Sequence, residues 1–256
     1  MRPELFSIGS FTVYSYGAMM ALGILMGILV AEKRAPKLGL EADHVFNMGM
    51  WGAAMGLVGA KLLYWIVELP QILEDPSLML DFGNGFVVYG GIIGGIFGGW
   101  LYAYRKKIVF LKYFDLVMPS VALGQAFGRI GCFLAGCCYG RETDGWFHVV
   151  FTQSHIAPNG VQLIPSQLVS SAADLLHFLV LIWLSKKTKG DGQVGGFYLI
   201  FYSIGRTLIE LLRDDPRGAV GGLSTSQFIS LFILLAGVAM VVFCGRKGKK
   251  EMVDPS

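Results

Sequence analysis

The chain has 256 residues, of which 54% are hydrophobic and only 15% are charged, whereas an ordinary soluble domain carries about 25% charged residues. This composition excludes an ordinary soluble enzyme, and the small net charge of +3 gives no support for a nucleic-acid partner. Three of the four cysteines fall between positions 132 and 138, so no ladder of disulfides is predicted.

The apolar runs between charge clusters predict seven membrane-spanning helices, because each run has roughly the 20 residues that cross a bilayer. In chain order they cover about residues 11–31, 45–67, 83–104, 113–137, 166–185, 194–213 and 223–244. We therefore expect an all-α integral membrane protein, with residues 1–256 forming a single polytopic membrane domain. The longest connection, about 138–165, holds a β-prone run and a Pro-Asn-Gly turn, which predict a small hairpin or lid on the outer face.

The basic residues predict the orientation of these helices. Fourteen of the 21 lie in alternate connections and the tail: Lys33, Arg34, Lys37, Arg105, Lys106, Lys107, Lys112, Lys186, Lys187, Lys189, Arg246, Lys247, Lys249 and Lys250. The connections on the other side hold only three. Because cytoplasmic loops carry the excess of Lys and Arg, the N-terminus is predicted to be periplasmic and the C-terminus cytoplasmic.

Glycine is unusually common, with 35 residues. In the third predicted helix, glycines at positions 90, 94 and 98, and again at 91, 95 and 99, recur every four residues. Such stripes of small residues let neighbouring helices approach closely. Close packing is the favoured interpretation, and a ligand role is the alternative.

Besides Asp115, which lies near the inner edge of its span, four cations and two carboxylates fall inside the predicted spans, where each costs at least roughly 2.5 to 3.5 kcal/mol at the bilayer centre and is a functional candidate by default. They are Lys61, Arg129, Arg206, Arg213, Asp174 and Glu210. At 1.5 Å per residue, Arg129 lies roughly 24 Å along its helix from the cytoplasmic side and Arg206 roughly 18 Å. The four cations are therefore predicted in the outer half of the bilayer.

The sixth predicted helix carries a polar stripe. Tyr202, Arg206, Glu210 and Arg213 are spaced by four, four and three residues, which places them on one face and lets Arg206 pair with Glu210. The excess of cations predicts an anionic ligand, above all the phosphate of an outer-leaflet lipid, which Arg holds bidentately. The alternative is that Arg129 and Arg206 only neutralise carboxylates such as Glu210 and Asp174, and that Lys61 and Arg213 extend to the interface.

The residues from Gly128 to Arg141, Gly-Arg-Ile-Gly-Cys-Phe-Leu-Ala-Gly-Cys-Cys-Tyr-Gly-Arg, resemble the signature of the prolipoprotein diacylglyceryl transferase (Lgt) family. Further motifs follow the order found in the family: Tyr16-Gly17, Gly59-Ala60-Lys61 with Tyr64, Tyr89-Gly90-Gly91, Pro165-Ser166-Gln167-Leu168, Tyr202 with Arg206 and Glu210, and Leu223-Ser224-Thr225-Ser226-Gln227. The resemblance covers about residues 10 to 230, and the signature is its specific part. Seven spans with an outer N-terminus is also the topology of the family.

The resemblance implies an enzyme that moves the diacylglyceryl group of phosphatidylglycerol to the lipobox cysteine of preprolipoprotein signal peptides, forming a thioether and releasing glycerol phosphate. It implies the bacterial cytoplasmic (inner) membrane as the location, with the active site toward the outer leaflet. Membrane lipids are the other expected partners, and no cofactor or metal is expected. The predicted catalytic residues are Arg129, Arg206, Glu210 and Tyr89. The predicted substrate-binding residues are Tyr16, Lys61, Tyr64, Gly90, Gly91, Gly140, Gln167 and Tyr202.

Six positions depart from the usual pattern of the family, among them Val169-Ser170 in place of a Tyr-Glu pair. Tyr89 and Ile164 stand where histidines are usual, Cys132 stands in place of an asparagine, and Cys137 stands in place of an acidic residue. These departures leave the group that accepts the thiol proton open. For Cys132, Cys137 and Cys138 the spacing favours small packing residues, with an outer-face disulfide or a covalent lipid carrier as alternatives.

Two other functions are considered. A transferase of the same fold with a different acceptor would explain the departures on the thiol side. An anion or lipid transporter would use the same buried cations as a substrate site, but no internal repeat is evident in the sequence.

Overall fold

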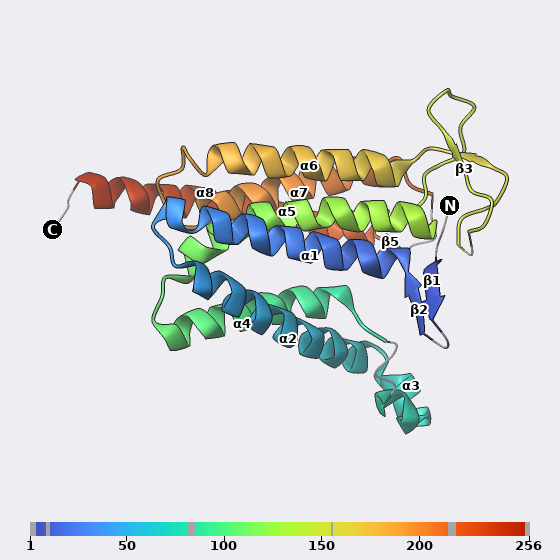
Figure 1. Ribbon diagram of the computed structural model, residues 1–256, viewed down its shortest axis with the longest axis horizontal. Coiled ribbons are helices and arrows are strands. Elements are labelled where there is room, and N and C mark those ends of the chain that lie inside the picture. Colours follow the sequence, from blue (N-terminus) through green and yellow to red (C-terminus); the bar gives the residue numbers. More distant parts are fainter. Residues whose placement is uncertain (1–3, 9–10, 81–84, 155, 215–218, 254–256) are drawn as a thin grey trace. The chain divides into compact units, whose positions relative to one another are not determined.

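The computed structural model describes residues 4–8, 11–80, 85–154, 156–214 and 219–253 (Figure 1). Seven long helices lie where the apolar runs predict them: α1 (Ser15–Arg34), α2 (Ala42–Val67), α4 (Val88–Lys106), α5 (Phe110–Ala135), α6 (Ser166–Leu184), α7 (Gln193–Glu210) and α8 (Thr225–Val253). The chain divides into two compact units, one made of residues 1–31 and 114–256 and the other of residues 32–113.

Five helices in the described part of the chain are long and apolar enough to cross a membrane, namely α1, α2, α5, α6 and α8. Many large apolar side chains on them are exposed, such as Ile66 and Leu176, as contact with lipid requires. In α4 glycine and tyrosine lower the mean hydropathy, and in α7 the polar stripe does so. The described chain is thus a mostly helical, multi-pass membrane protein.

The first unit begins with a hairpin rather than with a helix. The first helix was expected from about residue 11, but β2 (Phe11–Tyr14) pairs with β1 (Glu4–Ile8) in antiparallel fashion, so that α1 begins at Ser15. Aromatic and β-branched residues in β2 favour this extended conformation. From there α1 packs closely on α5, because a Cβ atom on Gly23 would lie only 2.9 Å from the Cβ atom of Phe127.

A carboxylate on α5 holds the start of α7. The backbone amides of Gly192 and Gly195 each donate to the Asp115 carboxylate at 2.7 Å. These amides have no partner within the helix, and the positive end of the helix dipole also favours the negative charge. Asp115 therefore anchors α7 against α5, next to an apolar core built on Ala122, Leu181 and Tyr198.

The connection between α5 and α6 forms the small hairpin that the sequence predicts. β3 (Val149–Val150) pairs with β4 (Gln162–Leu163) in antiparallel fashion. Phe151 and Leu163 are each 1% exposed and form a small separate core. A second two-stranded ribbon, β5 (Ala219–Val220) with β6 (Leu223–Ser224), precedes α8.

The second unit is dominated by the packing of α4 on α2. A Cβ atom on Gly90 or Gly94 would contact the backbone carbonyl oxygens of Gly59 or Met55, and one on Gly98 would lie 2.6 Å from the Trp51 carbonyl oxygen. The predicted close packing is confirmed for this stripe. The stripe that begins at Gly91 is looser, since the nearest contacts of Cβ atoms on its glycines would lie at 3.4 to 3.6 Å. The same unit holds the short helix α3 (Leu69–Glu74) and 3-10 turns at Pro36–Leu38 and Pro76–Leu80, which periodicity did not indicate.

Candidate active site

The polar stripe of α7 is built as the sequence predicts. Arg206 Nη1 lies 2.5 Å from Glu210 Oε2, and the two side chains are only 12% and 9% exposed. Arg206 Nη2 also donates a hydrogen bond to Ser226 Oγ at 2.9 Å. The guanidinium of Arg206 is therefore held from two directions, by its own helix and by the start of α8.

A capping box at the start of α8 fixes the position of Ser226. The Ser224 backbone amide donates to Gln227 Oε1 at 3.1 Å, and the Gln227 amide donates back to Ser224 Oγ at 3.2 Å. This reciprocal pair satisfies two amides at the first turn of α8. Ser226 was not predicted as a site residue, although the Ser-x-x-Gln spacing is the signal that could have located it.

Arg129 on α5 faces Asp174 on α6. Arg129 Nε lies 4.0 Å from Asp174 Oδ2, with the side chains 26% and 20% exposed. The pair engages Nε, and no hydrogen bond from the terminal Nη atoms of Arg129 is found within the described residues. Its terminal nitrogens are thus available to an anion. Asp174 was named only as a possible neutralising partner, because the rotation of α6 relative to α5 cannot be read from the sequence.

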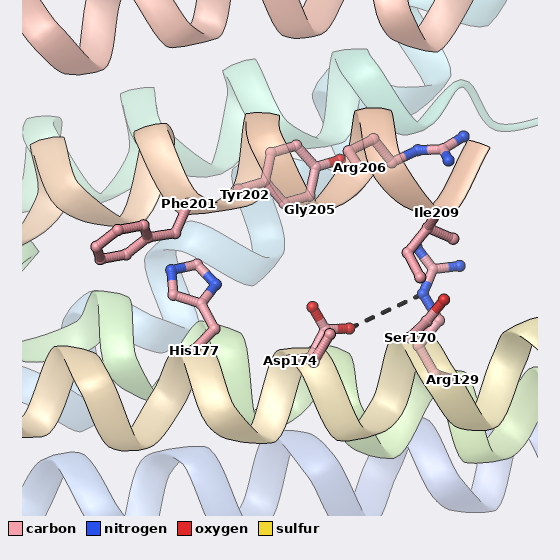
Figure 2. Close-up of a pocket in the computed structure, with 10 residues that line it drawn as sticks. Arg129, Ser170, Asp174, His177, Phe201, Tyr202, Gly205, Arg206 and Ile209 are labelled. Carbon is pink, nitrogen blue, oxygen red and sulfur yellow. Dashed lines mark ion pairs between the residues drawn. The ribbon is translucent and has the colours of Figure 1, made fainter. Parts of the chain in front are cut away.

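Both arginines line one cavity of about 50 Å³, which is room for a few water molecules, since one water needs about 10–15 Å³. The other lining residues are Ser170, Ala173, Asp174, His177, Phe201, Tyr202, Gly205 and Ile209. Figure 2 shows α7 on one side of the cavity and α6 on the other. The Asp174 carboxylate lowers the excess of positive charge that the sequence suggested, but two arginines still line this small cavity.

Tyr202 and Tyr16 occupy different positions near this site. Tyr202 lines the cavity and stacks on Tyr198, with ring centroids 6.0 Å apart. Tyr16, near the start of α1, is 43% exposed and packs against Gly131 of α5, where an added Cβ atom would lie 3.2 Å from the Tyr16 ring. Tyr202 therefore borders the cavity directly, whereas Tyr16 lies along α5.

Gly140 lies where three backbone segments meet. It forms an isolated bridge with Arg213, and a Cβ atom there would lie 2.9 Å from the Leu212 carbonyl oxygen and 3.0 Å from the Ile164 Cβ atom. The Arg141 amide donates to the Leu212 carbonyl oxygen at 3.0 Å. This close approach explains why a glycine stands at position 140. Arg213, which is 7% exposed, is held beside it.

Gln167 and Ser166 bind the loop that follows α5. Gln167 Nε2 donates to the Cys137 carbonyl oxygen at 2.8 Å, and Ser166 Oγ donates to the Cys138 carbonyl oxygen at 2.9 Å. Ser166 and Gln167 are each 1% exposed. The Pro-Ser-Gln motif thus fixes the backbone of two cysteines through Ser166 Oγ and Gln167 Nε2, while Gln167 Oε1 is buried with no hydrogen-bond partner among the described residues.

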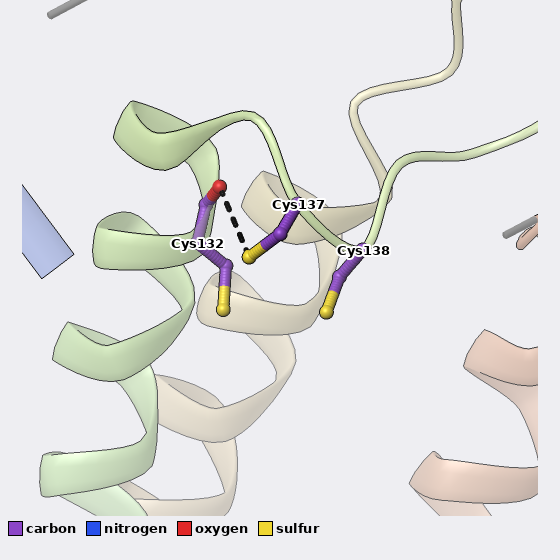
Figure 3. Close-up of side chains that lie close together, drawn as sticks. All are labelled: Cys132, Cys137 and Cys138. Carbon is purple, nitrogen blue, oxygen red and sulfur yellow. Dashed lines mark hydrogen bonds between the residues drawn. The ribbon is translucent and has the colours of Figure 1, made fainter. Parts of the chain in front are cut away.

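The three cysteines come together in space. The sulfur atoms of Cys132, Cys137 and Cys138 all lie within 4.8 Å of one another, and none is in a disulfide (Figure 3). Cys137 Sγ donates a hydrogen bond to the Cys132 carbonyl oxygen at 3.7 Å (Figure 3), and the Cys132 thiol together with the charge of Arg213 holds the pKa of the Cys138 thiol below its usual range. Spacings of five and one residues did not indicate this cluster.

Lys61 and Tyr64 lie in the second unit. Lys61 is 6% exposed, its ammonium lies 4.8 Å from the centroid of the Tyr64 ring and 5.4 Å from that of Phe86, and it donates to the Gly85 carbonyl oxygen at 3.5 Å. Gly85 has a φ of 72° and packs on the Tyr64 ring. These contacts stabilise the chain just before α4, and they give the buried ammonium local partners.

Tyr89, Gly90 and Gly91 stand at the first turn of α4, also in the second unit. Tyr89 is 40% exposed. Gly90 is in contact with the Gly59 backbone, whereas Gly91 has space for a methyl group. The predicted site residues therefore divide between the two units, with both arginines and Glu210 in the first.

The chain is similar to known proteins along nearly its whole length. Residues 3–243 match the family model described as prolipoprotein diacylglyceryl transferase. Over 93% of this chain and 96% of the relative, it is 50% identical to a protein of Clostridium tetani named phosphatidylglycerol–prolipoprotein diacylglyceryl transferase. Proteins with the same enzyme name from Clostridium perfringens, 47% identical over 98% of both chains, and from Clostridioides difficile, 34% identical over 97% of this chain and 98% of the relative, also match.

Proposed function

The chain belongs to the prolipoprotein diacylglyceryl transferase family, and from this premise we propose that Arg129 and Arg206 hold the lipid phosphate during the reaction. The enzyme transfers the diacylglyceryl group of phosphatidylglycerol to prolipoproteins. Family membership favours this transferase over an anion or lipid transporter. The observation that carries the proposal is that two arginines, from α5 and α7, line the same cavity.

The reaction is a displacement at a glycerol carbon. The sulfur of the lipobox cysteine forms a bond to that carbon, the bond from carbon to phosphate oxygen breaks, and the electron pair stays on the departing phosphate. The products are a thioether and glycerol phosphate. Negative charge therefore builds up on the phosphate in the transition state, where two preorganised guanidinium groups bind it more strongly than they bind the starting lipid.

The neighbours of the arginines act as positioning residues. Glu210 and Ser226 fix the guanidinium of Arg206, and Asp174 engages Nε of Arg129 so that its Nη atoms face the cavity. Tyr202 is a substrate contact at the same cavity. The contacts of Gly90, Gly140 and Gln167 support a role in shaping the fold rather than in binding the substrate, whereas Tyr16, Lys61, Tyr64, Gly91 and Tyr89 are assigned no contact beyond those described above.

The seven long helices are taken as seven spans of one polytopic membrane domain, with the N-terminus periplasmic and the active site toward the outer leaflet of the bacterial cytoplasmic membrane. The last turns of α1 and α4 carry Lys33, Arg34, Arg105 and Lys106, which supports a cytoplasmic position for these helix ends. Arg129 lies near the opposite end of α5 from Lys112, which agrees with a site in the outer half. Phosphatidylglycerol and signal peptides of preprolipoproteins then both reach the site sideways from the membrane.

Reconstitution tests this proposal. The full chain is placed in vesicles that contain phosphatidylglycerol labelled in its diacylglyceryl part, and a lipobox peptide is added. We expect the label on the peptide cysteine and one glycerol phosphate released for each peptide modified. Arg129→Ala is expected to abolish both products, and the exposed Arg141→Ala serves as the matched control that retains them. Equal activity in Arg129→Ala and the wild type would contradict the proposed role.

A further inference from the structure

The cluster of Cys132, Cys137 and Cys138 is formed by the way α5 ends. The Gly136 amide donates to the Phe133 carbonyl oxygen at 3.3 Å, and the Cys137 amide donates to the Cys132 carbonyl oxygen at 3.1 Å. With Gly136 at a φ of 74°, these two bonds form a Schellman motif. The motif folds the chain back on the last turn of α5 and brings Cys137 beside Cys132 despite the four residues between them.

Cys138 is held in a conformation that is uncommon for a residue other than glycine. Its φ is 59°, in the left-handed region. The hydrogen bonds from Ser166 and Gln167 to the carbonyl oxygens of Cys138 and Cys137 fix this loop from a different helix. Side chains packed so that they over-determine a strained backbone are typical of functional sites. Here the result is that three sulfur atoms converge.

Three converging sulfurs are a ligand set for a soft metal ion. Thiolates select ions such as Zn²⁺ and Cu⁺ over Mg²⁺ or Ca²⁺. Zinc–sulfur bonds of about 2.3 Å place the sulfurs of a tetrahedral site about 3.8 Å apart, so sulfurs within 4.8 Å need only small rotations to bind one ion. Cys132 is buried and the other two are partly exposed, which gives the set a closed side and an open side.

The charge around the cluster suits a metal trithiolate. Three thiolates and one divalent cation carry a net charge of −1. Arg213 contacts the Cys138 thiol, and Arg129 stands three residues before Cys132, one turn away on α5. These two cations offset the remaining negative charge. The cluster also lies beside the part of α5 that carries the proposed phosphate ligand.

We propose that Cys132, Cys137 and Cys138 bind one thiophilic divalent cation of the zinc class, and that the fourth position of the ion accepts the cysteine thiol of the prolipoprotein. Sites with three protein ligands and an open position are typical of catalytic zinc. The second part of the inference rests on the proposed function. The ion supplies what the arginine cavity lacks, since the one carboxylate that lines the cavity, Asp174, faces Arg129, and Glu210, the partner of Arg206, lies outside the lining.

The ion activates the acceptor thiol. A free thiol has a pKa of about 8.5 and is mostly protonated at neutral pH, whereas a thiol that coordinates such an ion loses its proton outright. The proton passes to water on the outer side. The metal-bound sulfur then attacks the glycerol carbon, the bond from carbon to phosphate oxygen breaks, and the neutral thioether, a weaker ligand, leaves the ion.

Metal analysis of the purified full chain tests the site itself. In detergent and under reducing conditions, with Zn²⁺ supplied and excess removed, we expect about one ion per wild-type chain. Cys137→Ser and Cys132→Ser are expected to lose the ion, whereas Cys244→Ser, which changes the remaining cysteine on α8, keeps it. Melting midpoints establish that the variants are folded. Wild-type protein without stoichiometric metal, or equal metal in Cys137→Ser, would overturn the site.

Cobalt replaces zinc as a spectroscopic probe of the fourth position. The Co²⁺-loaded wild type is expected to show sulfur-to-metal charge-transfer bands that change when a lipobox peptide is added, but not when a peptide with serine in place of the cysteine is added. Unchanged spectra with both peptides would overturn the thiol-binding part.

The transfer assay separates this inference from the proposed function. Removing the ion with a chelator is expected to slow transfer at least tenfold at pH 7, with recovery as the pH rises through the thiol pKa or when Zn²⁺ is returned. Full activity of the metal-free wild type would overturn thiol activation while leaving the transferase intact. If the metal-loaded wild type modifies no peptide, the proposed function fails, and the metal content alone then decides whether the site exists.

Discussion

The two units differ in the contacts between their helices. In the second unit α2 and α4 approach through glycines whose missing side chains let backbone meet backbone. In the first unit α5, α6 and α7 keep buried charges between them, in the pairs Arg129–Asp174 and Arg206–Glu210. The glycine contact stabilises without chemistry, whereas buried ion pairs contribute little net stability and are retained for function. Substitutions should therefore affect mainly stability in the second unit and mainly activity in the first, where removing one partner of an ion pair also lowers stability.

Removing Arg206 is expected to have the largest effect on activity. Arg206→Ala should lower the transfer rate at least about 100-fold, the usual cost of losing one group that stabilises the transition-state charge. It also leaves Glu210 buried without its partner, which destabilises the protein. The rate is measured with a labelled lipid and a lipobox peptide.

A double variant separates the two consequences. Arg206→Gln with Glu210→Gln removes both charges at nearly constant volume, so the melting midpoint should return toward that of the wild type while the activity stays lost. An active double variant would contradict the assignment of these charges to activity, because they would then serve packing alone.

Adding one methyl group at Gly90 is expected to have the largest effect on stability. Its Cβ atom would overlap the Gly59 carbonyl oxygen and lie 2.6 Å from the Leu63 Cβ atom, and overpacking of this kind costs about 1–3 kcal/mol or more. Gly91→Ala is the matched control, since its nearest contact is at 3.6 Å. Alanine also favours a helix over glycine by up to about 1 kcal/mol. Equal melting midpoints for the two variants would show that the stripe does not set the packing of α4 on α2.

Ser226→Ala tests how far the first unit depends on positioning. The variant removes the hydrogen bond to Arg206 Nη2, and a hydrogen bond to a charged group is worth about 1.5–3 kcal/mol. We expect about a tenfold lower kcat, with a melting midpoint lowered by no more than the loss of this one hydrogen bond accounts for. The control is Ser226→Thr, which keeps the hydroxyl and should retain most of the activity. A loss that appears only in KM would show that Ser226 affects lipid binding and not the alignment of Arg206.

Asp115 differs from the other charged residues discussed in the first unit, because its role is structural. Asp115→Ala removes the acceptor of the Gly192 and Gly195 amides, and losing a helix cap costs about 1 kcal/mol. A lower melting midpoint with unchanged kcat per folded enzyme is expected. If the rate falls while stability does not, Asp115 belongs to the reaction instead.

The sequence was sufficient for features set by residue type and local spacing. Apolar length located the seven helices, the four-residue spacing of Arg206 and Glu210 placed them on one face, and the glycine repeat predicted close packing. Family resemblance then supplied the reaction, which the comparisons support. These predictions succeeded because helix geometry alone relates the residues involved.

The features that the sequence did not reveal depend on how separate segments meet. Asp174 faces Arg129 only because of the rotation of α6, and Lys61 finds its partners in the chain before α4. The cysteine cluster requires a Schellman turn and two hydrogen bonds from α6. The first helix was expected too early because an apolar run does not distinguish a strand from the start of a helix.

The most direct test of the central claim is the mass spectrum of a reporter prolipoprotein from cells depleted of their own transferase. With the wild-type chain expressed, the account predicts a diacylglyceryl group on the lipobox cysteine. With Arg206→Gln/Glu210→Gln present at the same level in the membrane, it predicts an unmodified cysteine. An unmodified reporter with the wild-type chain, or a fully modified one with the double variant, would contradict the account.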